Sequence, residues 1–254
     1  MMGKLVALSI FLWLFLGSQV LAAELEGLIL YLPFDEGSGG TAYDKSGCGN
    51  DGDITGAEWV DAGKVGKCLE FDGSSFVEVP SSDSLEALVE EMTIAVWIKP
   101  ELTGSGWQGI VTKGNDVSEH LELLINVAGY IHRAQQFTTG RAYKNVGAAG
   151  TLSAGEWQHL AVTLKPGEWV TYINGEAVDT QVVNGDMVPD GLPLVVGDER
   201  PMNRLFQGLI DEVAVFNRAL SEDEIKEIME GIDSLLSVES MGKIATTWAA
   251  TKQQ

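Results

Sequence analysis

Two tight turns in the second half of the chain constrain its fold most strongly. Lys165-Pro166-Gly167 has the composition of a type II turn, and both residues of Asn174-Gly175 can adopt the positive φ of a two-residue hairpin loop. The flanking segments 160–164, 169–173 and 176–183 have the length and apolar content of β-strands. Together they predict a three-stranded antiparallel meander.

Short strands separated by glycine-rich turns continue through most of the chain. In residues 92–99 every second side chain is a large apolar one, and the segment stops at Pro100. Further candidate strands are 28–32, 69–71, 77–79, 109–112, 121–127, 130–133, 192–196 and 209–216. So many short strands, in a chain with 30 glycines, predict an all-β fold, an antiparallel sandwich of two sheets.

One helix is predicted after the last strand. Ser221 is its N-cap, and Glu224 completes a capping box. Ile225 and Ile228 begin an apolar stripe, and Gly231 ends the helix. We expect this short amphipathic helix to lie against the sandwich.

Both ends of the chain differ from the predicted domain, residues 26–231. Residues 1–22 combine Lys4, an apolar run and a small-residue end, which is typical of a cleaved signal peptide; a retained anchor is the alternative. The protein is therefore expected to be exported: secreted, periplasmic or at the cell surface. Residues 232–254 lack strand alternation and are predicted to be a flexible tail, with a docking or sorting segment as the alternative.

The charge of the chain excludes several classes of partner. The formal net charge is −21, and removal of the signal with Lys4, its one charge before Glu24, gives −22. Such a chain repels the phosphates of nucleic acids and anionic membrane surfaces. Cations and neutral polymers are the expected partners, without membrane insertion once the signal is cleaved.

The two cysteines, Cys48 and Cys68, predict a disulfide bond, because an even number of cysteines in an exported chain is normally paired. Two separate buried thiols are the alternative. The spacing fits neither a redox motif nor a zinc site.

Seven segments, in order, carry a resemblance to a known family. They are 28–39 (LILYLPFDEGSG), 44–47 with 50–52, 66–73 (GKCLEFDG), 93–97, 155–162 (GEWQHLAV), 172–175 (YING), and 208–213 (GLIDEV) with 217–221. Over about residues 26–231 the chain resembles the LamG-like jelly rolls of the concanavalin A-like lectin/glucanase superfamily. The resemblance implies a jelly-roll sandwich.

The resemblance also implies a structural calcium ion near the first and last strands. Its expected ligands are Asp211, Asp35, and Asp72 with the backbone carbonyl of Gly73, since scattered oxygen ligands suit calcium. The alternative is that these acids only cap turns. Glu212 should point to the opposite face and be solvated or salt-bridged.

Non-catalytic glycan binding is the function that the resemblance favours, with a protein-binding or adhesion role as the alternative. Aromatic rings flanked by polar side chains are the chemistry that binds sugars. Candidates in or beside turn-like stretches are Trp107, His132, Arg133, Arg141, Tyr143, Arg200 and Asn203. Each has the alternative of an ordinary structural role.

An enzyme of the same fold is disfavoured by the absence of a suitable acidic motif. The glucanase relatives carry three acids as Glu-x-Asp-x-x-Glu along one strand, and Glu70-Phe71-Asp72 lacks the last of them. The three histidines, His120, His132 and His159, show no metal-binding spacing.

Overall fold

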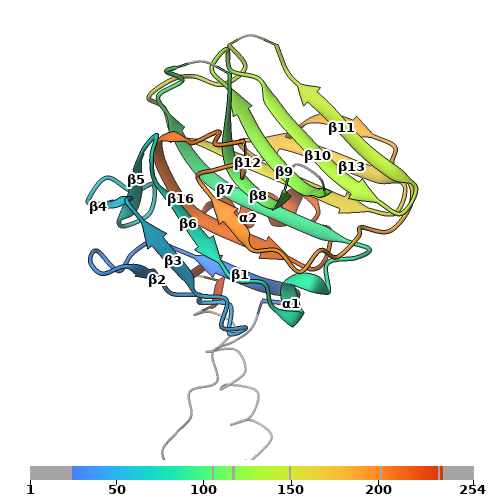
Figure 1. Cartoon of the computed structure of the whole chain (residues 1–254), viewed down its shortest axis with the longest axis horizontal. Helices are drawn as coiled ribbons and strands as arrows, with labels where there is room; N and C mark the ends of the chain where they lie inside the picture. The colour runs from blue at the N-terminus through green and yellow to red at the C-terminus, as the bar shows by residue number, and fades with distance from the viewer. Residues whose placement is uncertain are drawn as a thin grey trace, which may run out of the picture.

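The computed structural model describes residues 25–236 except 105, 116, 117, 149, 201 and 234, and it gives no side-chain description for 115 and 118–120. The chain forms two antiparallel eight-stranded sheets packed face to face (Figure 1). This confirms the predicted all-β jelly-roll sandwich. The predicted signal peptide lies outside the described residues.

The first sheet, called the β7 sheet, contains the predicted meander. Its order is β14 (Glu176–Gln181), β13 (Glu168–Ile173), β12 (Gln158–Lys165), β7 (Met92–Pro100), β16 (Gln207–Phe216), β5 (Cys68–Asp72) and β4 (Glu58–Val60), with β1 (Leu28–Leu32) also paired to β16. The turn at Asn174 has φ 50°, as its hairpin position requires.

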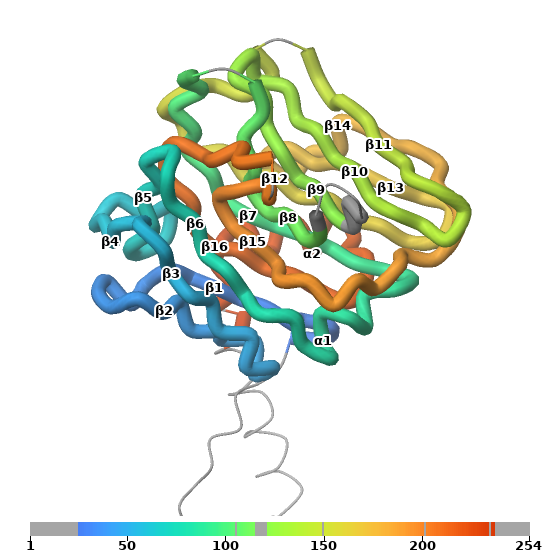
Figure 2. The backbone as a smooth tube through the Cα atoms, in the orientation of Figure 1, coloured from blue at the N-terminus to red at the C-terminus, as the bar shows by residue number. Residues whose placement is uncertain are grey.

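The second sheet, called the β8 sheet, lies in front of the first in the view of Figure 2. Its order is β11 (Gly140–Val146), β10 (Ile131–Phe137), β9 (Ser118–Asn126), β8 (Trp107–Asn115), β15 (Leu194–Val196), β6 (Phe76–Val79), β3 (Gly52–Thr55) and β2 (Thr41–Ala42). A short helix, α1 (Asp83–Glu86), follows β6.

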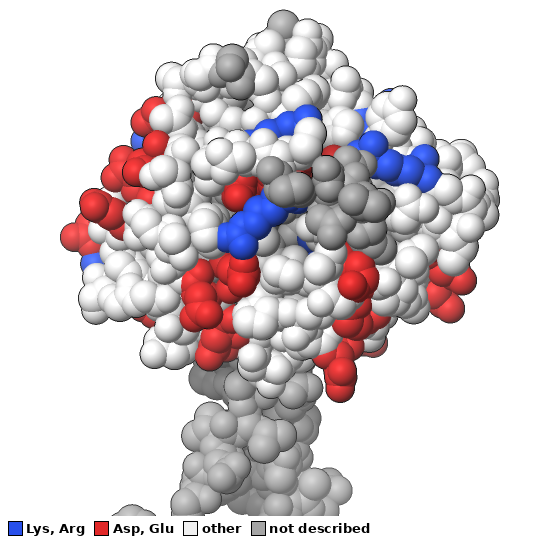
Figure 3. All heavy atoms as spheres, in the orientation of Figure 1, with Lys and Arg blue, Asp and Glu red and all other residues white. Residues whose placement is uncertain are grey.

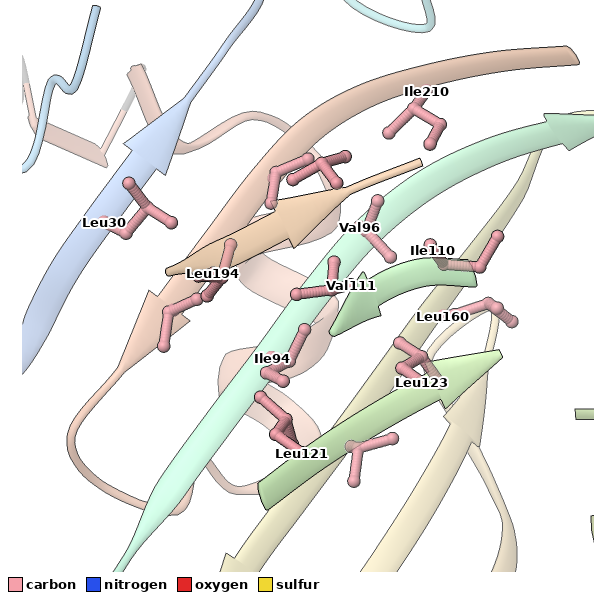
Figure 4. Packing of buried hydrophobic residues seen from close by; sticks show 14 of the residues in the cluster. Leu30, Ile94, Val96, Ile110, Val111, Leu121, Leu123, Leu160, Leu194 and Ile210 are labelled. Carbon is pink, nitrogen blue, oxygen red and sulfur yellow. The ribbon is translucent and has the colours of Figure 1, made fainter. Parts of the chain in front are cut away.

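Apolar side chains from the facing surfaces of both sheets fill the space between them. Figure 4 shows Ile94, Val96 and Leu160 of the β7 sheet directed towards Val111, Leu121 and Leu123 of the β8 sheet. All six are buried. Burying each such side chain contributes roughly 1.5–3 kcal/mol, so this layer holds the two sheets together.

The predicted helix, α2 (Glu222–Met229), covers the outer face of the β7 sheet. The Ser221 hydroxyl accepts from the Glu224 N–H and the Glu224 carboxylate accepts from the Ser221 N–H, which confirms the capping box. Ile225 and Ile228 pack with Ala95 and Ala161 of the sheet in a second apolar cluster. Because this face is covered as well, almost every residue of β7 is buried rather than every second one.

The packed part of the chain continues beyond the predicted domain end at 231. Ile232 is buried in the second cluster, and Leu235 and Leu236 pack against it. The rest of the predicted tail, 237–254, lies outside the described residues. No helix within the described ranges is long and apolar enough to cross a membrane.

Candidate functional site

A hollow on the solvent-facing side of the β8 sheet gathers four of the predicted binding residues. We call it the sheet-face hollow. It has a volume of about 300 Å³ and is lined by Trp107, Glu122, Leu124, His132, Arg141, Tyr143, Asn145 and Arg204. A volume of this size lies at the lower end of ordinary ligand sites.

The register of three neighbouring strands brings these side chains together. His132 of β10 lies opposite Leu124 of β9 and Asn145 of β11. Side chains alternate across a strand, so His132 faces solvent while Ile131 and Arg133 face the core. The hollow is therefore built on a rigid sheet rather than on loops alone.

Three aromatic rings form a row across the hollow. The Trp107 and His132 ring centroids are 5.2 Å apart, and the His132 and Tyr143 rings stack at 6.2 Å with an interplanar angle of 27°. Tyr143 is 64% exposed, more than the other strongly exposed tyrosine of the described residues, Tyr43, at 52%. The Arg141 guanidinium lies 5.6 Å from the Tyr143 ring centroid.

Glu122, the one carboxylate among the described residues that line the hollow, is buried and paired. Its oxygens lie 3.0 Å from Arg141 Nη2 and 3.4 Å from His132 Nε2. Burial acts to raise the pKa of Glu122, but the His132 hydrogen bond and the Arg141 charge outweigh it and hold that pKa below its usual value. His132 Nδ1 is 2.7 Å from Asn145 Oδ1.

A second hollow, the loop hollow, adjoins the first. It has a volume of about 550 Å³ and is lined by Gly73, Thr103, Gly104, Gly106, Trp107, Gln108, Met202, Asn203, Arg204, Leu205 and Gln207. Trp107 and Arg204 line both hollows. Arg204 Nη1 contacts both Glu199 oxygens, at 2.9 and 2.7 Å.

The structure thus divides the seven predicted binding residues. Trp107, His132, Arg141 and Tyr143 share the sheet-face hollow, and Asn203 lies in the loop hollow. Arg200 lines neither; it pairs with Glu78 and lies 3.8 Å from the Phe76 ring centroid.

The prediction for Arg133 is wrong, because its side chain is completely buried between the sheets. Its Nη2 donates to Asp179 Oδ2 at 2.7 Å, and its guanidinium lies 4.4 Å from the centroid of the Trp169 ring. Arg133 therefore ties β10 to β13 and β14 of the opposite sheet.

Sequence reasoning missed Glu122, Asn145 and Arg204. Period-two alternation was the available signal for the first two. Asn145 pairs with His132, and Glu122 pairs with Ala134 two residues further along β10, so both side chains lie on the same face of the sheet as His132. No comparable signal marks Arg204, which lies in the irregular segment between β15 and β16.

Asp211 and Glu212 occupy a β-bulge in β16, between its pairing with β5 and its pairing with β1. Asp211 is fully buried, and its Oδ2 accepts from the N–H groups of Lys64 and Val65 at 2.8 and 3.1 Å. Glu212, at φ 52°, accepts from the Tyr31 hydroxyl on both oxygens at 3.0 Å. The expectation that Glu212 is solvated or salt-bridged is wrong.

Both carboxyls of the bulge have raised pKa values. Burial raises the pKa of Asp211 to about 7, and backbone hydrogen bonds offset this only in part. Burial and the adjacent Asp211 charge raise the pKa of Glu212 to about 8. Within the described part of the chain, neither carboxyl accepts a hydrogen bond from a cationic side chain.

The predicted calcium ligands do not come together as one set. Asp35 and Asp211 both bind the 64–67 segment, where Asp35 Oδ1 accepts from Lys67 N–H at 2.7 Å. Asp72, however, pairs with Gln207, four residues along β16 from Asp211 and so about 13 Å away. Its carboxylate caps the turn at Ser74 instead. Within the described ranges, no group of three or more His, Cys, Asp or Glu side chains can hold a metal ion.

The predicted disulfide is not formed. Cys68 lies on β5 beside the 211 position of β16, whereas the Cys48 sulfur lies 4.0 Å from the carbonyl oxygen of Leu28, which pairs with Phe216. Because of the bulge, this stretch of β16 matches only four residues of β7, from Trp97 to Thr93, or about 13 Å. A disulfide needs Cα atoms within about 7 Å.

Sequence comparison identifies the family. A model of the family described as "Concanavalin A-like lectin/glucanases superfamily" matches residues 71–226. The chain belongs to this superfamily.

One curated protein matches this superfamily member at low sequence identity. The adhesion G-protein coupled receptor V1 of Danio rerio is 23% identical over 149 residues, which are 56% of this chain and 2% of the receptor. The chain therefore spans only a small part of that curated relative.

Solved structures of binding domains resemble the superfamily fold of this chain. The binding domain of Paraclostridial Mosquitocidal Protein 1 superposes with a TM-score of 0.65 and 17% identity, over 80% of this chain and 52% of that one. Domain 4 of AbnA, an extracellular arabinanase from Geobacillus stearothermophilus, was solved in complex with arabinotriose. It superposes with a TM-score of 0.61 and 21% identity, over 81% of this chain and 100% of that domain.

Proposed function

We propose that the protein is an exported, non-catalytic module that binds a neutral glycan in the sheet-face hollow. The row of Trp107, His132 and Tyr143 rings is the observation that carries this proposal. Aromatic faces bind the apolar faces of sugar rings, and a few fixed polar groups beside them orient the hydroxyls.

The polar groups of the hollow suit hydroxyl groups better than charged ligands. Arg141 and His132 contact Glu122, and Arg204 contacts Glu199, so each arginine of the hollow already faces a carboxylate. Figure 3 shows charges of both signs on this face, with Asp and Glu atoms along its left and lower margins. At a net charge of −21, the chain also repels polyanions at long range.

The comparisons support a glycan as the ligand. The superfamily is named for lectins and glucanases, and the AbnA domain was solved with arabinotriose. The similarity to an adhesion receptor favours a second candidate, a protein-binding role on the same face. Catalysis is disfavoured because the acid nearest to a glucanase motif, Asp72, caps a turn outside the sheet-face hollow.

Calcium remains part of the proposal, with a smaller ligand set. Asp35 and Asp211 fit the ion, because both bind the same segment and, among the described residues, no cationic side chain donates to the buried Asp211; Asp72 and Gly73 do not fit. Backbone carbonyls of Val65 and Lys67, which crowd around Gly63, offer further oxygens. The ion would neutralise Asp211 and link the first strand to β16.

A glycan array tests the proposed function. Wild-type protein should bind neutral oligosaccharides, Tyr143→Ala should lose them, and Tyr43→Ala, which truncates an exposed tyrosine outside both hollows, should retain them. Neither arabinotriose nor any bound glycan should be cleaved. Binding of a protein ligand with no glycan retained would favour the adhesion role, and equal binding by Tyr143→Ala would exclude this hollow.

A further inference from the structure

The loop hollow begins where the sheet-face hollow ends. Trp107, the first residue of β8, lines both hollows, and so does Arg204. The backbone ties Arg204 to β8 two residues beyond Trp107, since Arg204 O accepts from the Gly109 N–H at 2.6 Å. The two hollows therefore form one continuous surface with the half-buried Trp107 ring between them.

The composition of the loop hollow suits a polar ligand. Thr103, Gln108, Asn203 and Gln207 place amide and hydroxyl groups around it, and its lining, as far as the structure describes it, contains no Asp, Glu or Lys side chain. A Cβ at Gly106 would meet no atom within 4 Å. The space beside Gly106 is therefore open.

One buried polar atom beside the loop hollow lacks a partner. Gln108 is only 4% exposed, and its Nε2 donates to Thr103 O at 3.1 Å, but its buried Oε1 accepts no hydrogen bond from the described residues. An unpaired buried acceptor is unfavourable, and a donor that reaches it recovers free energy. The adjoining hollow is where a ligand hydroxyl can approach this amide.

We infer that the loop hollow is a second sugar subsite, so that one oligosaccharide lies across Trp107 with at least one unit in each hollow. This inference rests on the proposed function, because the sheet-face hollow supplies the first subsite. It identifies the ligand class further, as a chain of two or more units rather than a terminal monosaccharide. Gln108 and Asn203 are the specificity-determining residues of the second subsite.

Ladders of cello-, xylo- and arabino-oligosaccharides, one to four units long, test the inference by titration calorimetry. In a series that binds, affinity should rise by about tenfold between one unit and two or three, a ratio that corresponds to 1.4 kcal/mol. Tyr143→Ala should weaken every length. Asn203→Gly, which keeps the φ of 54° accessible, and Gln108→Leu should remove the gain with length.

Two matched variants serve as controls. Gln135→Leu alters another buried glutamine of the β8 sheet with an unpaired Oε1, outside both hollows, and should keep the gain with length. Tyr43→Ala should keep it as well. If Gln108→Leu fails to fold, Asn203→Gly alone decides, since Asn203 is exposed.

The outcomes separate this inference from the proposed function. Affinity that is independent of length, or a gain that survives both Asn203→Gly and Gln108→Leu, overturns the second subsite and leaves the first intact. Absence of binding by every ladder overturns both.

Discussion

The sheet-face hollow and the bulge of β16 contain equally buried carboxyls with opposite electrostatics. Glu122 and Glu212 are each 4% exposed. The pKa of Glu122 is lowered, because Arg141 and His132 outweigh its burial, whereas the pKa of Glu212 rises to about 8. The partner, rather than the depth of burial, decides whether a buried carboxyl keeps its charge.

This difference separates a binding surface from a structural joint. In the hollow, paired charges leave a neutral, fixed polar surface beside aromatic rings. At the bulge, the donors to the acids among the described residues are backbone N–H groups and the Tyr31 hydroxyl, so neutrality requires either protons or a cation.

Removal of the Asp211 carboxyl should have the largest effect on the stability of the fold. Asp211→Ala leaves the buried Lys64 and Val65 N–H groups without their acceptor and should destabilise the fold by about 2–5 kcal/mol. Asp72→Ala, in an exposed turn, should cost less than about 1 kcal/mol. Urea unfolding in EDTA measures both, and equal effects would show that the bulge is not a joint.

Calcium should stabilise the bulge and leave the hollow unaffected. At a hundredfold excess over its Kd, linkage gives about 2.7 kcal/mol, and extracellular calcium modules have Kd values of about 10⁻⁴ to 10⁻³ M. Asp211→Asn should abolish most of the rise in Tm, whereas Glu122→Gln should retain it. An identical Tm in EDTA and in millimolar calcium would exclude the metal.

The two regions should respond to pH with opposite signs. In EDTA, the raised pKa values of Asp211 and Glu212 mean that the folded state binds more protons than the unfolded state. Their contribution is therefore full below the unfolded values of about 4 and is lost as pH rises towards 8. The lowered pKa of Glu122 gives a contribution that is lost as pH falls into the acidic range.

Variants that replace each carboxyl by a neutral amide isolate the contribution of each region to the pH dependence of stability. Relative to wild type, Asp211→Asn with Glu212→Gln should flatten the fall in Tm between pH 4 and 8, a window set by those pKa values. Glu122→Gln should change only the acidic limb. A parallel Tm curve for the double variant would mean that neither acid is protonated in the fold.

Truncation of the exposed Tyr143 ring should have the smallest effect on stability. Tyr143→Ala should weaken glycan binding by about tenfold or more, because a stacking face is lost, yet change stability by less than about 0.5 kcal/mol. Tyr43→Ala should change neither. A large loss of stability in Tyr143→Ala would show that the ring supports the sheet rather than a ligand.

The sequence was sufficient for the elements and for much of the hollow. Turn chemistry and alternation predicted the meander around Asn174-Gly175, and the capping box predicted the helix at Ser221. Alternation also implied that His132 and Arg133 face opposite sides, but not which side faces solvent. That choice depends on the second sheet, whose Asp179 and Trp169 hold Arg133.

Predictions that joined distant segments were less successful, for one geometric reason. The proposed pairs Cys48 with Cys68 and Asp72 with Asp211 each needed a position along β16 that no local pattern supplies. Asp35 with Asp211 was brought to one segment, because the chain before β5 folds back over the bulge.

A titration followed by nitrogen-15 NMR tests the central claim most directly, because two indole N–H signals report on separate regions. Trp107 lies in the sheet-face hollow, and the Trp59 indole donates to Gly39 O at 2.9 Å, away from it. Titrated with the neutral oligosaccharide that binds best on the array, the Trp107 signal should shift to saturation while that of Trp59 stays in place. A stationary Trp107 signal at saturating glycan would contradict the account.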